Sequence, residues 1–340
     1  MIVKKLVVAG VVGAIAGIGH ALPASAADKL SVVSNGQGSV NYTASLAIGT
    51  VLKQKAGIDS TVSPFAGPQV WLNLLDEGSA DLGIANAIDV SQAMSGLPPN
   101  YKKPHKNLRL VSLTFALLNG VVVRADSGIK SLSDARGKRV TGEYVAHQTC
   151  REISNGQLAS VGLDWKDVSV IPVQSSAAGG EALRAGRVDV NMCAPIGQAV
   201  LQQLHVRTPL RFISVGHDEA AQKRFREHFP TGRAKLVEKG TSFGVEENTW
   251  VWEYDFYLAA GKHTKDDDIY KIMQVLWESL PDLVKIAPLL NSMTQERMAD
   301  RTASFTIPYH PGAIRFFKEK NAWTPAMEAH QQKLIKEASN

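Results

Sequence analysis

The residues best suited to covalent chemistry are Cys150 and His147, which stand three positions apart at the expected start of a helix. A helix N-terminus and a neighbouring imidazole both lower the pKa of a thiol, so Cys150 could act as a nucleophile. No carboxylate is evident to orient His147, and Cys193 could consume the thiol by forming a disulfide in an oxidising compartment. We therefore expect no catalytic residues, and a Cys/His enzyme is the less favoured alternative.

A loop near the start of the chain suits a different chemistry, the reversible binding of a small anion. Residues 34–42 join a strand-like segment at 29–33 to a helical pattern at 44–52. Gly36 and Gly38 let the backbone approach a ligand, and the helix start presents N–H groups with partial positive charge. The loop matches neither the dinucleotide-binding motif nor the phosphate loop. A small anion would fit it, although an ordinary strand-to-helix connection would look the same.

The elements around this loop alternate between strand and helix, which is typical of a parallel sheet covered by helices. Further strands are predicted at 58–63 and 80–85. In such sheets ligands bind outside the carboxyl ends of the strands, so the loops that follow the strands should converge. The polar or flexible residues at these ends are Gly36 and Ser39, Gly67 and Gln69, and Asn86 and Asp89. A simple helix cap would explain Asp89 equally well.

A partial internal repeat predicts a second lobe of the same kind. Residues 75–82 and 183–190 both read Leu-x-x-Gly-x-x-Asp followed by an aliphatic residue. In each copy the glycine would take the left-handed conformation that ends a helix, and the chain would reverse into a buried strand. Strands at 108–113 and 120–124 lead into this second lobe, and residues 249–258 alternate as a long returning strand would.

The second lobe has its own counterpart of the opening loop. Residues 142–149 lie between a strand at Val140 and a helix predicted at 150–161, and they include Tyr144 and His147. The next strand of this lobe ends in Cys193-Ala194-Pro195, which places Cys193 beside the loop. We therefore expect this loop to face the loop at 34–42.

The first 26 residues have the features of a secretory signal peptide. Lys4 and Lys5 precede an apolar run at 6–18 that is too short to span a bilayer, and an Ala-x-Ala site ends at Ala26. No later stretch is apolar enough to cross a membrane. We expect cleavage near Ala26 and a periplasmic protein.

Composition and charge argue against several classes of function. The chain has 340 residues, of which 44% are hydrophobic, and is long enough for two lobes with separate cores. Its net charge is +5, of which Lys4 and Lys5 contribute two, and the remaining +3 is too weak for nucleic-acid binding. The nine histidines show no paired metal-ligand spacing, and the acidic residues 266–268 fit a helix start better than a metal site. We expect no nucleic acid, no metal and no cofactor.

The order and spacing of several motifs resemble the extracytoplasmic solute receptors of the TAXI type, which serve TRAP transporters. The similar segments are residues 36–42, 78–82, 124–132, 137–140, 186–189 and 307–320, the last with a His-Pro-Gly-Ala signature. The resemblance spans nearly the whole mature chain.

This resemblance implies an α/β periplasmic binding protein, a type II-like Venus flytrap. Each of its two lobes would be a mainly parallel sheet flanked by helices, and two crossing strands would join them. The implied boundaries are lobe I at 27–121, lobe II at 122–252, and a return to lobe I with C-terminal helices at 253–340. Such a protein would capture a small organic carboxylate (an amino acid, keto acid or dicarboxylate) by lobe closure and deliver it, as a monomer, to a TRAP transporter. A binding protein of an ABC importer, which also closes two lobes around its ligand, is the alternative.

The family's binding residues correspond to residues 38–42, residues 67–70, Asn86 and the loop that ends at Thr149. The sequence departs from the family where Gly-Thr-Tyr is replaced by residues 39–41, and where Gly-Ser-Gly-Thr is replaced by residues 146–149. Together with the strand-end residues, the expected ligand-binding set is Gly36, Gly38, Ser39, Val40, Asn41, Tyr42, Gly67, Pro68, Gln69, Val70, Asn86, Asp89, Tyr144, His147, Gln148, Thr149, Cys193 and Pro195.

Overall fold

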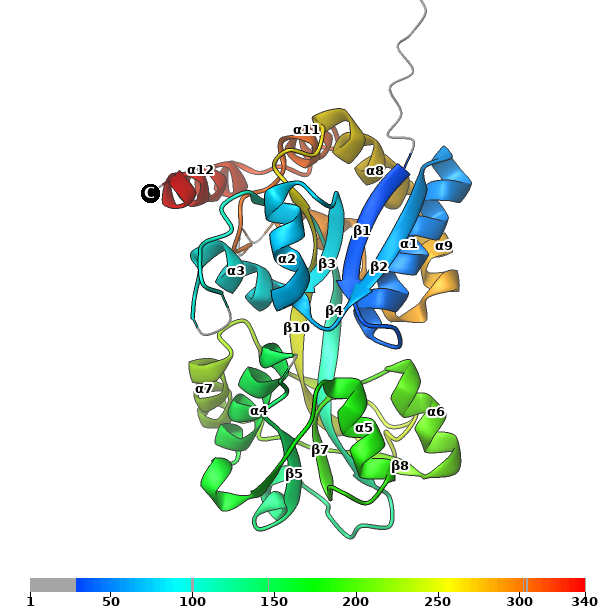
Figure 1. Cartoon of the computed structure of the whole chain (residues 1–340), viewed down its shortest axis with the longest axis vertical. Coiled ribbons are helices and arrows are strands. Elements are labelled where there is room, and N and C mark those ends of the chain that lie inside the picture. Colours follow the sequence, from blue (N-terminus) through cyan, green and yellow to red (C-terminus); the bar gives the residue numbers. More distant parts are fainter. Residues whose placement is uncertain (1–28, 99–100, 146, 302, 304, 340) are drawn as a thin grey trace, which may run out of the picture.

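The chain forms two lobes joined by two long strands (Figure 1). The structure, a computed structural model, describes residues 29–98, 101–145, 147–301, 303 and 305–339. The predicted signal peptide at 1–26 lies outside the described residues, as does Ala146 of the second-lobe loop. The predicted two-lobed α/β architecture is confirmed, but one mixed sheet and one contiguous apolar core run through both lobes where a separate sheet and core were expected for each.

Lobe I begins with three parallel strands and the helices between them. In chain order these elements are β1 (Lys29–Asn35), α1 (Val40–Ala56), β2 (Asp59–Phe65), α2 (Pro68–Glu77), β3 (Leu82–Asn86) and α3 (Ala87–Ser95). Strand β1 lies between β2 and β3 and pairs with both in parallel. The carboxyl ends of the three strands therefore lie at one edge of the sheet, the edge that faces lobe II (Figure 1).

Two long antiparallel strands cross between the lobes, namely β4 (Leu108–Arg124) and β10 (Thr249–Gly261). The returning strand was expected, but the prediction of two separate strands at 108–113 and 120–124 is wrong because one continuous strand covers both. Asn119-Gly120 has the composition of a turn, yet here the glycine serves close packing. A Cβ atom on Gly120 would lie 2.8 Å from the ring of Phe212.

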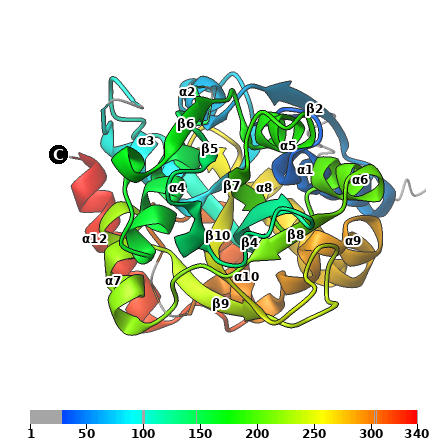
Figure 2. The same ribbon diagram turned by 90° about the horizontal axis from the view of Figure 1, so that it is seen from below.

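Lobe II repeats the arrangement of lobe I. Its elements are β5 (Arg139–Gly142), α4 (Gln148–Ser160), β6 (Ser169–Pro172), α5 (Ser176–Arg184), β7 (Val190–Pro195), α6 (Ala199–Arg207), β8 (Leu210–Ile213), α7 (Glu219–His228) and β9 (Arg233–Val237). Strand β5 pairs in parallel with β6 and β7. The ten-stranded sheet runs β2-β1-β3-β10-β4-β7-β5-β6, and off this path β8 pairs with β4 and β9 with β10. Seen from below, α4 and α7 lie to one side of β7, and α5 and α6 to the other (Figure 2).

The two copies of the internal repeat have the same local structure. Gly78 and Gly186 both adopt positive φ angles, of 83° and 67°, as the sequence predicts. The aspartate three residues later then bonds to the first strand of its own lobe. Asp81 accepts from the backbone N–H of Ser31 at 2.8 Å, and Asp189 accepts from that of Arg139 at 2.9 Å. The repeat therefore reports a real structural equivalence between the lobes.

The chain returns to lobe I after β10 and ends in helices that pack on it (Figure 1). These are α8 (Asp266–Glu278), α9 (Leu280–Ile286), α10 (Gln295–Ala299), α11 (Pro311–Glu319) and α12 (Pro325–Ser339). The acidic residues 266–268 form the first turn of α8, where negative charge is favourable. Within the described ranges, no helix has the length and apolarity needed to cross a membrane.

The His-Pro-Gly-Ala segment near the C-terminus is structural. His310 is fully buried at the start of α11, where its Nδ1 accepts from the N–H of Gly312 at 3.2 Å and its Nε2 lies 3.0 Å from the carbonyl oxygen of Thr264. Burial lowers the pKa of His310, so the ring is neutral and Nε2 is the donor. A Cβ on Gly312 would lie 2.2 Å from the carbonyl oxygen of Asp266, so only glycine lets α11 approach α8 this closely.

Candidate ligand-binding site

A cavity of about 280 Å³ lies between the two lobes. Its lining comes from the strand-end loops of both lobes and from the crossing strands. The lining residues are Asn35, Gly36, Gln37, Ser39, Val40, Asn41, Ala66, Asn86, Leu117, His147, Gln174, Ser175, Ser176, Ala177, Cys193, Pro195, Gln198, Tyr254 and Phe256. The loops at 34–42 and 142–149 thus reach the same cavity from opposite lobes, as expected from the repeat.

The polar walls of the cavity are formed by helix starts. Five of the lining residues are N-caps: Ser39 of α1, Asn86 of α3, His147 of α4, Ser175 of α5 and Gln198 of α6. Each helix start carries partial positive charge, and several such ends around one space create a positive potential without any cationic side chain.

The helix starts differ in how many N–H groups remain for a ligand. The side chains of Ser39, Asn86 and Ser175 each accept from a backbone N–H of their own helix, at 3.2, 2.8 and 3.3 Å. His147 and Gln198 make no such side-chain bond. The first turn of α6 therefore keeps more donors that a ligand could satisfy, whereas in α4 the N–H of Cys150 already donates to the carbonyl oxygen of His147 at 3.0 Å.

The floor of the cavity is apolar and comes from the crossing strands. Leu117 of β4 and Tyr254 and Phe256 of β10 are all buried, with 4%, 3% and 3% of their surface exposed. The rings of Tyr254 and Phe256 lie 5.7 Å apart, and Phe115 stacks on Phe256 with ring centroids 4.8 Å apart. A ligand in this cavity would meet donors on its sides and apolar side chains beneath it.

No lysine, arginine, aspartate or glutamate is among the lining residues. His147 is the one histidine among the described lining residues, and burial lowers its pKa to about 4. The ring is therefore neutral at neutral pH and offers a hydrogen bond, not a charge. An anion bound here would be held by dipoles and neutral donors.

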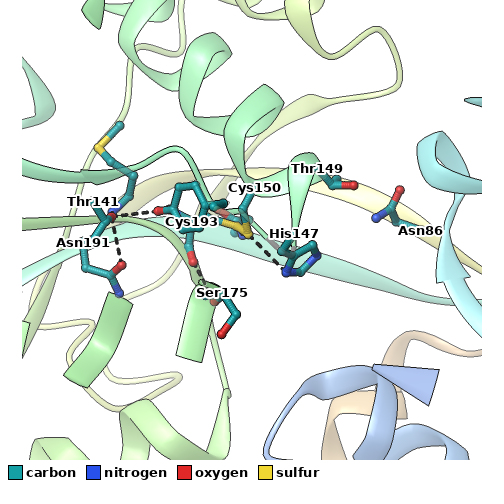
Figure 3. The surroundings of a disulfide bond; sticks show 12 residues. Asn86, Thr141, His147, Thr149, Cys150, Ser175, Asn191 and Cys193 are labelled. Carbon is teal, nitrogen blue, oxygen red and sulfur yellow. Dashed lines mark hydrogen bonds between the residues drawn. A yellow bond between two sulfur atoms is a disulfide. The ribbon is translucent and has the colours of Figure 1, made fainter. Parts of the chain in front are cut away.

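A disulfide between Cys150 and Cys193 forms part of the lobe II wall (Figure 3). It ties the first turn of α4 to the end of β7, and Nδ1 of His147 lies 3.6 Å from the Cys150 sulfur. Figure 3 also shows Asn86 of lobe I pointing toward Thr149 and His147. Because Cys150 is bonded, it offers no thiol nucleophile, and the enzyme alternative loses the group on which it depended.

Tyr144 anchors the lobe II loop from beneath. Its side chain is fully buried, and its hydroxyl lies 2.7 Å from Oγ1 of Thr141 and accepts from the N–H of Cys193 at 3.1 Å. Glu143 and Tyr144 both have positive φ angles, of 59° and 44°, which non-glycine residues rarely adopt. This turn directs Tyr144 into lobe II and brings His147 to the cavity.

Asp89 and Thr149 connect the lobes beside the cavity. Oγ1 of Thr149, on α4, donates to the Asp89 carboxylate on α3, and Asn86 Nδ2 donates to the same carboxylate at 2.6 Å. Burial raises the pKa of Asp89 to about 7, while the Thr149 and Asn86 hydrogen bonds act in the opposite direction. One turn further along, Gln92 on α3 donates to Glu152 on α4 at 3.0 and 3.1 Å. These contacts link α3 to α4.

The predicted ligand-binding residues divide into two groups. Those that line the cavity are Gly36, Ser39, Val40, Asn41, Asn86, His147, Cys193 and Pro195. Those outside its lining are Gly38, Tyr42, Gly67, Pro68, Gln69, Val70, Asp89, Tyr144, Gln148 and Thr149.

The start of α2 illustrates why some predicted residues lie outside the lining. Trp71 is fully buried, and its indole N–H donates to Oδ1 of Asn35 at 3.0 Å, so α2 supports the loop at 34–42 from behind. Val70 is 51% exposed to solvent. Of the loop between β2 and α2, only Ala66 lines the cavity.

The lining residues that were not predicted are Asn35, Gln37, Ala66, Leu117, Gln198, residues 174–177, Tyr254 and Phe256. Residues 174–177 follow β6 and begin α5, so the strand-end rule applied to lobe II could have found them. Tyr254 and Phe256 alternate along the predicted returning strand, which places them on one face of it, but nothing in that pattern shows which face meets the cavity.

Comparisons with known proteins agree with this architecture. The sequence model of the NMT1-like family matches residues 33–320. A solved protein described as a periplasmic transporter is similar at 15% identity, with a TM-score of 0.60, over 92% of this chain and 99% of that one. Rpa4515 of R. palustris, solved with adipate, is similar at 13% identity and a TM-score of 0.53, over 92% and 97% of the chains. PhnD1 of Prochlorococcus marinus, in complex with methylphosphonate, is similar at 11% identity and a TM-score of 0.53, over 87% and 99%. These similarities show the fold of periplasmic binding proteins.

Proposed function

Because the chain belongs to the NMT1-like family, we propose that it is a periplasmic solute-binding protein that captures a small organic carboxylate and delivers it to a membrane transporter. The ligand would bind between the lobes, and the closed form would be the one that the transporter recognises. The disulfide consumes the thiol of Cys150, and the proposal is reversible capture without chemistry.

One observation carries this proposal: five helix N-caps surround a cavity that no charged side chain lines. Micromolar binding needs about 8 kcal/mol. A helix end contributes roughly 0.3–2 kcal/mol to a bound anion, and a hydrogen bond to a charged group about 1.5–3 kcal/mol. Several helix ends and a few hydrogen bonds therefore suffice for a carboxylate.

The apolar floor and the ligands of the similar proteins support the same ligand class. Leu117, Tyr254 and Phe256 suit the hydrocarbon part of an organic acid better than an inorganic anion. Two proteins of the same fold were solved with small anions, adipate and methylphosphonate. Adipate carries a carboxylate at each end of a hydrocarbon chain, and methylphosphonate carries one methyl group on its phosphonate.

For the transporter we propose the TRAP type, on the resemblance of segments such as 78–82 and 307–320 to TAXI receptors. Uptake in proteoliposomes should then require an ion gradient and proceed without ATP. Uptake that needs ATP and no gradient would instead assign the protein to an ABC importer.

Ligand capture can be tested by a substitution that places a negative charge in the cavity and leaves its helices intact. In Ser175→Asp the new carboxylate keeps the N-cap of α5, since aspartate caps helices as well as serine does. Like charges in a water-poor site repel strongly, so we expect the affinity for a small carboxylate to fall at least tenfold by titration calorimetry. Wild-type ligands would come from a thermal-shift screen of mono- and dicarboxylates and amino acids.

Two matched variants control for this change. Ser175→Asn keeps the cap and adds no charge, so it should bind close to wild type. Thr294→Asp puts the same charge at the N-cap of α10, outside the cavity, and should have no effect. Equal affinity in Ser175→Asp and wild type would show that the carboxylate binds elsewhere.

A further inference from the structure

A second hollow of about 560 Å³, here called the apolar groove, adjoins the cavity. Its lining residues are Ser39, Val40, Thr43, Phe115, Ala116, Leu117, Leu118, Ile196, Gly197, Ala199, Gln202, Val237, Thr241, Ser242, Ile286, Ala287, Pro288, Leu289 and Asn291. Most of them are apolar, and none carries a charge.

The groove shares wall residues with the cavity. Ser39, Val40 and Leu117 line both spaces. On the lobe II side the two spaces meet at consecutive residues, because Pro195 lines the cavity and Ile196 lines the groove. A ligand whose head lies among the helix starts would therefore have the groove directly beyond Val40 and Leu117.

Both lobes build the groove. Its lobe I wall comes from α1, β4 and the segment after α9, and its lobe II wall comes from the start of α6 and the residues around β9. Figure 1 shows α9 and α6 on the same side of the molecule, one in each lobe. Lobe closure would therefore enclose whatever lies in the groove together with the head group in the cavity.

The volumes of the two spaces also support one ligand that occupies both. Sites for small organic ligands have volumes of about 300–1,000 Å³, and the cavity alone, at about 280 Å³, lies at the lower end of that range. The groove is twice as large as the cavity. Both spaces have apolar walls, and the helix starts add hydrogen-bond donors to the cavity, so the two together could hold a molecule with an anionic head and a hydrocarbon tail.

We propose that the ligand is an amphipathic carboxylate whose head is held by the helix starts and whose hydrocarbon tail extends past Val40 and Leu117 into the apolar groove. This inference rests on the proposed function and specifies its ligand class. The tail is the occupant of the groove, and each methylene that enters it leaves water for an apolar surface.

The test is a series of straight-chain carboxylates from propionate through hexanoate to decanoate, titrated into the full chain. Affinity should rise about three- to fourfold for each methylene that the groove takes up. Binding that does not depend on chain length would overturn the tail assignment and leave the proposed function standing. Failure of every carboxylate, short or long, to bind would overturn both.

Variants locate the tail. Ile286→Asn changes a groove residue that is 43% exposed, so the fold should tolerate it, and Ala199→Gln makes a second exposed groove position polar. Each should weaken decanoate binding at least threefold and leave propionate binding unchanged. Val206→Asn, at a valine that is 83% exposed and lies outside the groove, is the control and should change neither.

Two outcomes of the variant experiment would overturn the proposal. One is a wild-type chain-length effect that Ile286→Asn and Ala199→Gln leave intact, since the tail would then lie elsewhere. The other is a loss of transport in these variants with unchanged decanoate affinity, since the groove would then contact the membrane partner.

Discussion

At the scale of single residues, Asp89 is the buried carboxyl group through which pH should act on stability. Its pKa is raised from 3.8 to about 7, chiefly by burial, so the folded chain holds the proton more tightly than the unfolded chain. This contribution to stability is complete below about pH 4 and is lost as pH rises through 7. The free energy of unfolding of Asp89→Asn, relative to that of wild type, should therefore rise by roughly 2–3 kcal/mol between pH 5 and pH 8. Urea unfolding at both pH values measures it.

The control for this prediction is Asp59→Asn. Asp59 has a side chain that is 52% exposed and pairs with Lys53 on the surface. Its loss should therefore shift stability by less than about 1 kcal/mol and without the same pH trend. A difference between Asp89→Asn and wild type that stays constant from pH 5 to pH 8 would contradict a protonated Asp89.

Residue by residue, the sequence locates the candidate site where simple backbone rules hold. Ser39 and Asn86 follow parallel strands and begin helices, so their position at the cavity could be predicted. Tyr144 could not be placed in the same way. Glu143 and Tyr144 both adopt the left-handed conformation, which turns the Tyr144 side chain into lobe II. Tertiary contacts impose this conformation on two non-glycine residues, so it cannot be predicted from the neighbouring sequence.

At the scale of secondary-structure elements, the disulfide holds the first turn of α4 against the end of β7. Its two cysteines are separated by 43 residues, and closing a loop of that length should stabilise the protein by about 3–4 kcal/mol. We expect the double variant Cys150→Ser/Cys193→Ser to lose stability of this order in urea unfolding. Wild type unfolded under reducing conditions is the control and should match the double variant. Equal stability of oxidised wild type and the variant would contradict this role.

Elements were predicted well where a periodic pattern or the repeat marked them, and less well where close packing overrides composition. The strands of lobe I and the returning strand follow from alternation. Strand β4 could not be predicted in this way, because Gly120 interrupts its alternating pattern. The glycine makes room for the ring of Phe212, which lies 92 positions later in the chain, so the neighbouring sequence gives no sign of this contact. The pairing of Cys150 with Cys193 could be considered from the sequence, but only their approach in lobe II decides it.

At the scale of the whole molecule, two sets of contacts hold the lobes in the observed arrangement. Beside the cavity, Thr149 bonds to Asp89, joining α4 to α3. Behind it, Asp255 on the crossing strand β10 pairs with Arg233 of β9 and with Arg297 of α10. The first set joins lobe to lobe directly, whereas the second joins each lobe to the strand between them. Opening of the cleft must therefore break the Thr149–Asp89 bond, and closure must form it.

Thr149→Val tests whether that bond favours the closed form. Valine keeps the shape of threonine but cannot donate, and one hydrogen bond contributes about 1 kcal/mol, a factor of about five in an equilibrium. We expect the ligand-free variant to have a larger radius of gyration in X-ray scattering and ligand binding that is weaker by a factor of up to about five, because a smaller share of molecules is in the binding form. Thr50→Val is the control, since Thr50 bonds only within α1, to the carbonyl of Leu46. If Thr149→Val scatters and binds as wild type does, the arrangement of the lobes does not depend on this bond, and the Gln92–Glu152 hydrogen bonds together with the ion pairs of Asp255 would have to maintain it.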